Sequence, residues 1–207
     1  MSEKPRCGWS LGSASMREYH DVEWGFPTGD DVGLFEKINL EGFQSGLSWK
    51  TVLDKRADFR RVFHGFDIAR VARMGERDVV RLLGDASIIR HRGKIESTIN
   101  NARRCLELVE EKGSLAAHIW SFEPPRRPVA PTTAEVSTFV TAPESVALSK
   151  DLKKRGWSFV GPTTMYAFMQ SMGLVNDHDE ACHVWPTAEK ARKRFRIDGR
   201  SRRDLGE

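Results

Sequence analysis

Four side chains that commonly bind metal ions lie near the two ends of the 207-residue chain, namely Cys7, His20, His178 and Cys182. The last two are separated by three residues, a spacing that places two side chains on one face of a helix. Two thiolates and two imidazoles would complete a closed tetrahedral zinc site, which would tie the N-terminal segment to the last helix. His183 is a competing ligand, and ordinary packing of separate Cys and His residues is the alternative to any metal site.

A group of aromatic and acidic residues occurs in the sequences YHDVEWG and LEGFQSGLSW. Its members are Tyr19, Trp24, Glu41, Gln44 and Trp49. Glu41 stands in an apolar helical pattern, where a carboxylate is costly to bury without a partner, so it must reach solvent or face a site. Aromatic rings beside one carboxylate would suit a flat cationic ligand. Composition alone favours another interpretation, in which the Trp residues are core and Glu41 lies at a helix edge.

A basic turn is predicted in the sequence SIIRHRGKI, residues 87–95. Here Arg90, His91, Arg92 and Lys94 surround Gly93. Their positive charge, together with the backbone amides at the start of the following helix, could hold a phosphate. An ordinary solvated turn between two helices is the alternative interpretation.

Helices must position these groups, because apolar residues recur at helical spacing along most of the chain and no convincing strand alternation occurs. The patterns cover 34–43, 52–62, 95–109, 144–155 and the residues after Pro162. Five prolines between residues 122 and 143 predict an irregular loop there. The expected fold class is therefore all-α.

The charge is distributed unevenly along the chain. The net charge is +4, but residues 190–207 hold eight basic and three acidic residues, so residues 1–189 sum to −1. We therefore predict one helical unit over 1–189, made of two helical subdomains, and a basic, flexible tail over 190–207. Binding to nucleic acid would then depend on a local basic patch of the body.

Several classes of protein are excluded by composition. Hydrophobic residues at 39% exclude global disorder, and three widely spaced cysteines argue against a disulfide framework. The N-terminus lacks the apolar run of a signal peptide, and no uncharged stretch is long enough to span a membrane. We expect a cytoplasmic, monomeric protein without membrane contacts.

Taken together, the motifs resemble the DNA-3-methyladenine glycosylase I family of the helix-hairpin-helix glycosylase superfamily. The matching stretches are RCGW at 6–9, YHDVEWG at 19–25, LEGFQSGLSW at 40–49, IIRHRGKI at 88–95, LSKDLKKRGWSFVGPTTMYAFMQSMGLVNDH at 148–178, and then Cys182. They occur in the family's order over residues 6–183, and only the tail falls outside them. Several long motifs in one register are far more specific than any single motif.

The resemblance implies a helical enzyme that flips 3-methyladenine out of alkylated double-stranded DNA and hydrolyses its N-glycosidic bond. It implies zinc held by Cys7, His20, His178 and Cys182. It also implies a base pocket of Glu41, Tyr19 and Trp49, with Trp24 beside it. An aromatic position of the family corresponds here to Met16, for which we expect altered affinity and not loss of activity.

For the DNA, the resemblance places Gly46 and Leu47 near the gap that the flipped base leaves. The turn from Arg90 to Lys94 would hold backbone phosphates without reading the sequence. Residues 98–115 contain no Asp, although many enzymes of the superfamily place one beyond the hairpin to stabilise an oxocarbenium-like sugar. Glu41 is therefore assigned to binding the base and its charge.

Two other functions remain open at this point. A zinc-stabilised protein that binds nucleic acid without catalysis would share the turn and the metal site, but it would not need Tyr19, Glu41 and Trp49 together. A glycosylase with a broader range, acting also on other cationic purines such as 7-methylguanine, is the second, and Met16 keeps it open.

Overall fold

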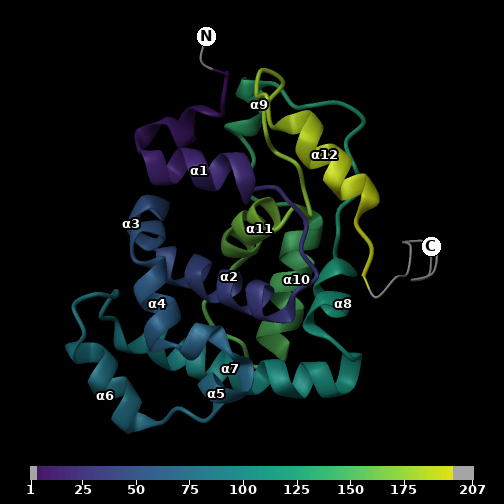
Figure 1. Ribbon diagram of the computed structural model, residues 1–207. Helices are drawn as coiled ribbons and strands as arrows, with labels where there is room; N and C mark the ends of the chain where they lie inside the picture. The colour runs from purple at the N-terminus through teal and green to yellow at the C-terminus, as the bar shows by residue number, and fades with distance from the viewer. Residues whose placement is uncertain (1–3, 198–207) are drawn as a thin grey trace.

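The computed structural model describes residues 4–197, and within that range it consists of helices and connecting loops without a strand element (Figure 1). The all-α class predicted from the periodicity is thereby confirmed. In chain order the helices are η1 Gly8–Gly12, α1 Ala14–Val22, α2 Asp31–Gln44, α3 Trp49–Asp54, α4 Arg56–Val62, η2 His64–Phe66, α5 Ile68–Ala72, α6 Glu76–Gly84, α7 Arg92–Lys112, α8 Leu115–Trp120, α9 Thr133–Val136, α10 Pro143–Lys154, α11 Pro162–Ser171 and α12 Trp185–Arg194.

Helix α2 runs through the middle of the molecule and packs against α3, α7, α8 and α11 (Figure 1). Its N-cap is Asp30, whose carboxylate accepts a hydrogen bond from the backbone N–H of Gly33 at 2.8 Å. Every residue from Leu34 to Phe43 is buried, including the charged ones. A helix buried on all sides is a core element, so the charged residues on it require partners inside the protein.

The proline-rich segment is irregular over most of its length, as predicted. The exception is the one-turn helix α9, which the prediction missed. Thr132 and Glu135 form a reciprocal capping box around it, and this box gives a short helix a defined start without any buried residue.

The body continues beyond the predicted boundary at residue 189. Helix α12 extends to Arg194, and Arg192 is 3% exposed, donating hydrogen bonds to the carbonyls of Gly173 and Leu174 at 2.7 Å. The Phe195 ring lies 4.5 Å from that of Trp120. The prediction of a flexible tail from residue 190 is therefore wrong for residues 190–197, because the basic side chain of Arg192 is hydrogen-bonded inside the fold. Residues 198–207 lie outside the described range.

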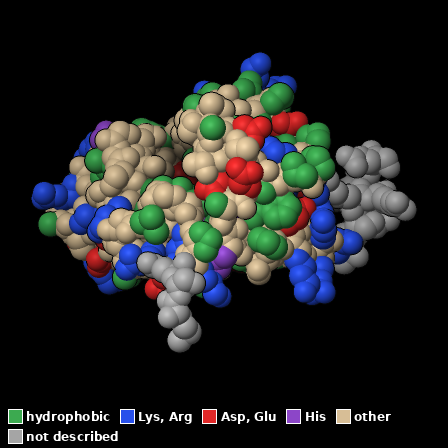
Figure 2. All heavy atoms as spheres, turned by 90° about the horizontal axis from the view of Figure 1, so that it is seen from above, with side chains coloured by type: hydrophobic (Ala, Val, Ile, Leu, Met, Phe, Trp, Pro, Cys, Tyr) green, Lys and Arg blue, Asp and Glu red, His purple; other side chains and the backbone are tan. Residues whose placement is uncertain are grey.

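The surface carries charge of both signs. Viewed from above, acidic side chains gather toward the middle of the molecule and many Lys and Arg side chains lie around its rim (Figure 2). In the part of the chain that the structure describes, no helix is both long enough and apolar enough to cross a membrane.

Candidate active site

A cavity of about 550 Å³ opens among α1, α2, α3, α9 and α11. Its walls contain every residue predicted for base binding, together with several that were not predicted. The lining residues are Trp9, Met16, Tyr19, Trp24, Glu41, Gln44, Ser48, Trp49, Lys50, Val136, Ser137, Ala167 and Gln170. Residues from the first fifty positions and from the C-terminal half thus form one site.

The aromatic side chains are arranged to receive a flat ring. The Tyr19 and Trp49 rings lie 5.3 Å apart at 41°, and the Trp9 and Trp24 rings meet edge to face at 5.1 Å. The indole Nε1 of Trp49 is buried and has no hydrogen-bond partner among residues 4–197. A planar ligand would gain stacking contacts here, and a cationic one would gain attraction to the ring faces.

Glu41 brings one carboxylate to the cavity and is only 5% exposed. Its placement at a helix edge, favoured by composition alone, is wrong. Burial raises the pKa of Glu41 to about 7, although the Lys37 ammonium and the Ser171 hydroxyl oppose that rise. The carboxylate is therefore poised to respond to a positive charge that enters the cavity.

Lys37 is a charged residue near the cavity that the sequence analysis missed. It lies one helical turn before Glu41 on α2 and is 2% exposed. Its Nζ donates to the Tyr19 hydroxyl at 3.0 Å and to Glu23 Oε1 at 3.1 Å. The four-residue spacing to Glu41 was the signal that could have found it, because i and i+4 share one helix face.

Three of the four predicted metal ligands come together beside the cavity, and His178 lies next to them. One ligand atom each from Cys7, His20 and Cys182 lies within 4.8 Å of the others. The His178 ring is 4.9 Å from that of His20, and its buried Nε2 has no hydrogen-bond partner among residues 4–197. His178 and Cys182 lie in loop and turn segments before α12, so the expectation that they share a helical face is wrong.

Hydrogen bonds at Nδ1 fix both imidazoles, and His20 Nε2 lies 3.4 Å from the Cys182 sulfur. His20 Nδ1 lies 2.8 Å from a carboxylate oxygen of Asp21, which can only accept. His178 Nδ1 lies 2.8 Å from Asn176 Oδ1, whose amide orientation is fixed because its Nδ2 donates to the Trp185 carbonyl. Each ring therefore carries its proton on Nδ1 and leaves an Nε2 lone pair available, as zinc-binding histidines do.

The electrostatics of the cluster also suit a metal. Burial lowers the pKa of His178 to about 4, which keeps this imidazole neutral. A hydrogen bond from Cys7 lowers the pKa of the Cys182 thiol, with His20 acting in the same direction. The competing ligand His183 is half-buried, and its Nδ1 lies 2.8 Å from the Pro5 carbonyl. The residues present thus fit a zinc ion with two sulfur and two nitrogen ligands.

The basic turn lies between α6 and α7. Arg90, His91 and Arg92 are exposed, but Arg92 is paired with Glu76 at 2.9 Å and with Glu96 at 3.0 Å. Lys94 faces inward and donates to the carbonyls of Phe43 and Ser45 at 2.8 and 2.6 Å. The prediction that Lys94 holds phosphate is wrong in geometry, because its position in the first turn of α7 directs it to the end of α2.

The loop between α2 and α3 projects at the edge of the cavity. Gly46 has a φ of 80°, in the left-handed region that favours glycine, and Leu47 is 42% exposed. Ser48 caps α3, which begins at Trp49. A tight turn thus presents an exposed apolar side chain two residues from the cavity's indole wall.

Comparisons with known proteins agree with this geometry. A family model described as methyladenine glycosylase matches residues 9–185. This chain belongs to the methyladenine glycosylase family. It is 50% identical over 183 residues to DNA-3-methyladenine glycosylase 1 of Escherichia coli, covering 87% of this chain and 97% of that protein. It is 45% identical over 178 residues to DNA-3-methyladenine glycosylase of Haemophilus influenzae, covering 86% of this chain and 96% of the relative.

Solved structures of the family share the fold. The 3-methyladenine DNA glycosylase I of Staphylococcus aureus, described for its recognition of 3-methyladenine, superposes with a TM-score of 0.83 at 30% identity. That match covers 89% of this chain and 98% of the other. Another crystal structure of 3-methyladenine DNA glycosylase I superposes with a TM-score of 0.82 at 48% identity, covering 86% of this chain and 98% of the other.

The stability of this glycosylase should depend on the ionisation of Glu41. The folded-state pKa of about 7 lies above that of an unfolded Glu, so the folded state pays a cost that grows as pH rises from about 4.5 to 7. Glu41→Gln removes that cost, and also the attraction between Glu41 and Lys37. We expect the free energy of unfolding of the variant, relative to that of the parent protein, to rise by roughly 2 kcal/mol between pH 5 and pH 8, measured by urea unfolding.

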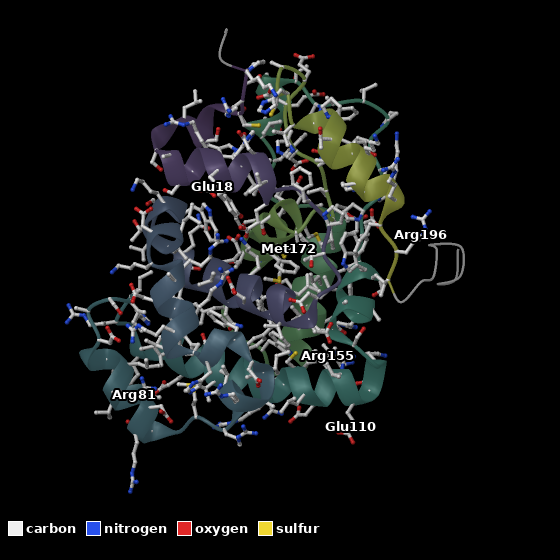
Figure 3. The ribbon with its side chains drawn as sticks, in the orientation of Figure 1. Glu18, Arg81, Glu110, Arg155, Met172 and Arg196 are labelled. Atoms are coloured by element: carbon white, nitrogen blue, oxygen red, sulfur yellow. The ribbon has the colours of Figure 1, made fainter. Side chains whose placement is uncertain are left out.

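The control is Glu110→Gln at an exposed position, which Figure 3 labels, and its free energy of unfolding should show no such trend. A pH-independent difference for Glu41→Gln would contradict the assignment.

Proposed function

We propose that this protein removes 3-methyladenine from alkylated DNA by accepting the flipped base into the cavity and hydrolysing its N-glycosidic bond without cleaving the DNA backbone. Membership of the methyladenine glycosylase family and 50% identity to DNA-3-methyladenine glycosylase 1 of Escherichia coli support this reaction. The observation that carries the site assignment is the buried Glu41 carboxylate in a cavity walled by Tyr19, Trp24 and Trp49.

The chemistry of the lesion explains why so few catalytic groups are needed. Methylation at N3 makes the adenine cationic, which weakens the glycosidic bond and lets the base leave as a neutral molecule. Strong acid catalysis is then unnecessary. Glu41 binds the flipped base through its charge, and the rings stack on it, so a neutral adenine gains less from the same contacts.

Excision by purified protein tests this assignment. We expect the free base released from methylated double-stranded DNA to be 3-methyladenine, identified by chromatography. Glu41→Gln should slow its release roughly 10- to 100-fold, the loss of one charge-assisted hydrogen bond. Glu110→Gln serves again as a matched control and should keep the parent rate.

The same experiment distinguishes the alternatives. Release of 7-methylguanine at a comparable rate would indicate the broader range that Met16 leaves open. Tight DNA binding with no base released would identify a protein that binds nucleic acid without catalysis. A normal rate for Glu41→Gln would remove this carboxylate from the mechanism.

We also propose a structural zinc ion held by Cys7, His20, His178 and Cys182. The donor set, the Nδ1 acceptors Asp21 and Asn176 behind the two imidazoles, and the unpartnered Nε2 of His178 support this proposal. When bound, the ion would cross-link the two ends of the described chain. It would take no part in the reaction, because its four positions are filled by protein.

Metal analysis of protein purified without chelator should give one zinc per chain. Cys182→Ser should lose most of the zinc and lower the melting temperature, since metal binding contributes directly to folding. Cys105→Ser is the matched control, because Cys105 is also a buried free thiol but lies on α7 within the apolar core. Equal zinc content in the two variants would exclude Cys182 as a ligand.

For the DNA, we propose that Arg90 and His91, the amides at the start of α7, and the loop of Gly46 and Leu47 face the substrate. Arg90 is exposed, and unlike Arg92 it forms no ion pair with an acidic residue of the described range 4–197. Phosphate contacts would hold the duplex in place, and Leu47 would lie beside the gap left by the flipped base. The monomeric state stays a prediction.

Arg90→Ala should weaken DNA binding and reduce the slope of log K against log salt concentration by about one. Fluorescence anisotropy over a range of salt concentrations measures both quantities. Arg196→Ala is the control, since Arg196 lies at the opposite edge of the molecule from α6 (Figure 3) and should change the slope little. An unchanged slope for Arg90→Ala would place the phosphate contacts elsewhere.

A further inference from the structure

Lys37 is buried at a place where a positive charge has a cost. The side chain is 2% exposed, and burial lowers the pKa of its ammonium, although Glu23 and Glu41 oppose that shift. It does not line the base cavity. It lines a neighbouring cavity of about 250 Å³ with Glu23, Glu36 and Arg60, and its Nζ contacts Tyr19 and Trp49, which line the base cavity.

Four contacts hold the ammonium in one position. Nζ donates to Glu23 Oε1 at 3.1 Å and to the Tyr19 hydroxyl at 3.0 Å. It also lies 4.5 Å from the centre of the Tyr19 ring and 4.6 Å from that of Trp49. Glu23 is itself held by Arg56 at 2.6 Å. The ion pair and the two ring faces keep Lys37 charged and fixed.

The contact with Tyr19 has a direction. An ammonium group has only donors, so the oxygen of Tyr19 must be the acceptor. One lone pair of this hydroxyl is therefore occupied on the side away from the base cavity, and its proton must point elsewhere. Among residues 4–197, the Lys37 ammonium is the group that donates a hydrogen bond of clear geometry to this oxygen.

We propose that Lys37 is a positioning residue for base recognition, which presents the Tyr19 hydroxyl to the cavity as a hydrogen-bond donor. A purine ring offers unsubstituted nitrogens, which are acceptors, so a hydroxyl held in the donor sense matches the edge of the base. Without Lys37 the hydroxyl would be free to rotate and would lose part of its binding energy to that reorientation. The inference rests on the proposed function, in which Tyr19 contacts the base.

A double-mutant cycle tests the proposal. Free 3-methyladenine is titrated into the parent protein, Lys37→Met, Tyr19→Phe and the double variant, with tryptophan fluorescence as the readout. Lys37→Met keeps an unbranched side chain against the rings and removes the donor. We expect each single variant to bind roughly three- to tenfold more weakly, the loss of about one hydrogen bond. The double variant should bind no more weakly than Tyr19→Phe alone.

The outcomes separate the two proposals. If Tyr19→Phe binds like the parent protein, the role of Tyr19 in the proposed function fails, and this inference fails with it. If Tyr19→Phe weakens binding but Lys37→Met does not, only the role of Lys37 is overturned. If Lys37→Met weakens binding equally in both backgrounds, it acts through general structure, and orientation of the hydroxyl is again overturned.

Two further variants control for stability. Arg60→Met removes a neighbouring ion pair, the one between Arg60 and Glu36 at 2.8 Å on the same cavity, and should leave the affinity unchanged. Should Lys37→Met fail to fold, Lys37→Gln takes its place in the cycle. The Gln amide can donate or accept, so it does not fix the direction in which the Tyr19 hydroxyl donates. The criterion is unchanged: the effect of the substitution on affinity must vanish in the Tyr19→Phe background.

Discussion

The burial of two opposite charges on one face of α2 is the constraint on which the rest of the site depends. Lys37 and Glu41 are both nearly inaccessible, and neither could remain charged there without groups from other helices. Glu23, at the end of α1, and Arg56, on α4, complete the group. Ion pairs therefore hold α1 and α4 near α2 in addition to apolar contacts. The base cavity lies beside Glu41, between α2 and the residues of α1.

The cysteine and histidine cluster includes His20 of helix α1. Tyr19 and His20 are consecutive residues of α1, so their side chains leave the helix in different directions, one toward the base cavity and one toward the cluster. Fixing His20 therefore fixes the rotation of α1 and, with it, the position of the Tyr19 ring. Trp24 lies between the two sites, with its ring 4.7 Å from that of His178. The proposed zinc ion, by holding His20, would therefore also hold the Tyr19 ring that lines the base cavity.

The sequence predicted the parts of this protein that depend on local pattern, and failed where the outcome depends on tertiary partners. Helical periodicity correctly predicted α7, α10 and α11. The motifs grouped Tyr19, Trp24, Glu41, Gln44 and Trp49, the family resemblance added Met16, and all six line one cavity. Lys94 and Arg192 were both interpreted as surface cations, because a lysine or arginine in a basic run is usually solvated. Each is buried instead because backbone carbonyls at the end of another segment lack partners, and nothing in the local sequence reports that need.

The burial of Lys37 was also not predicted from the sequence, but Lys37 pairs with charged side chains and not only with backbone carbonyls. Together Lys37, Arg56, Glu23 and an ionised Glu41 carry no net charge, and protonation of Glu41 would leave the group with one positive charge. A cationic base entering the cavity therefore favours the ionised form of Glu41, because that form offsets the charge of the ligand. When the glycosidic bond breaks and the base becomes neutral, this attraction is lost, while the cost of keeping a buried carboxylate charged remains. If the proposed base pocket is correct, this arrangement would bind the damaged nucleotide more strongly than the free product, because the ionised Glu41 offsets the charge of the damaged base alone.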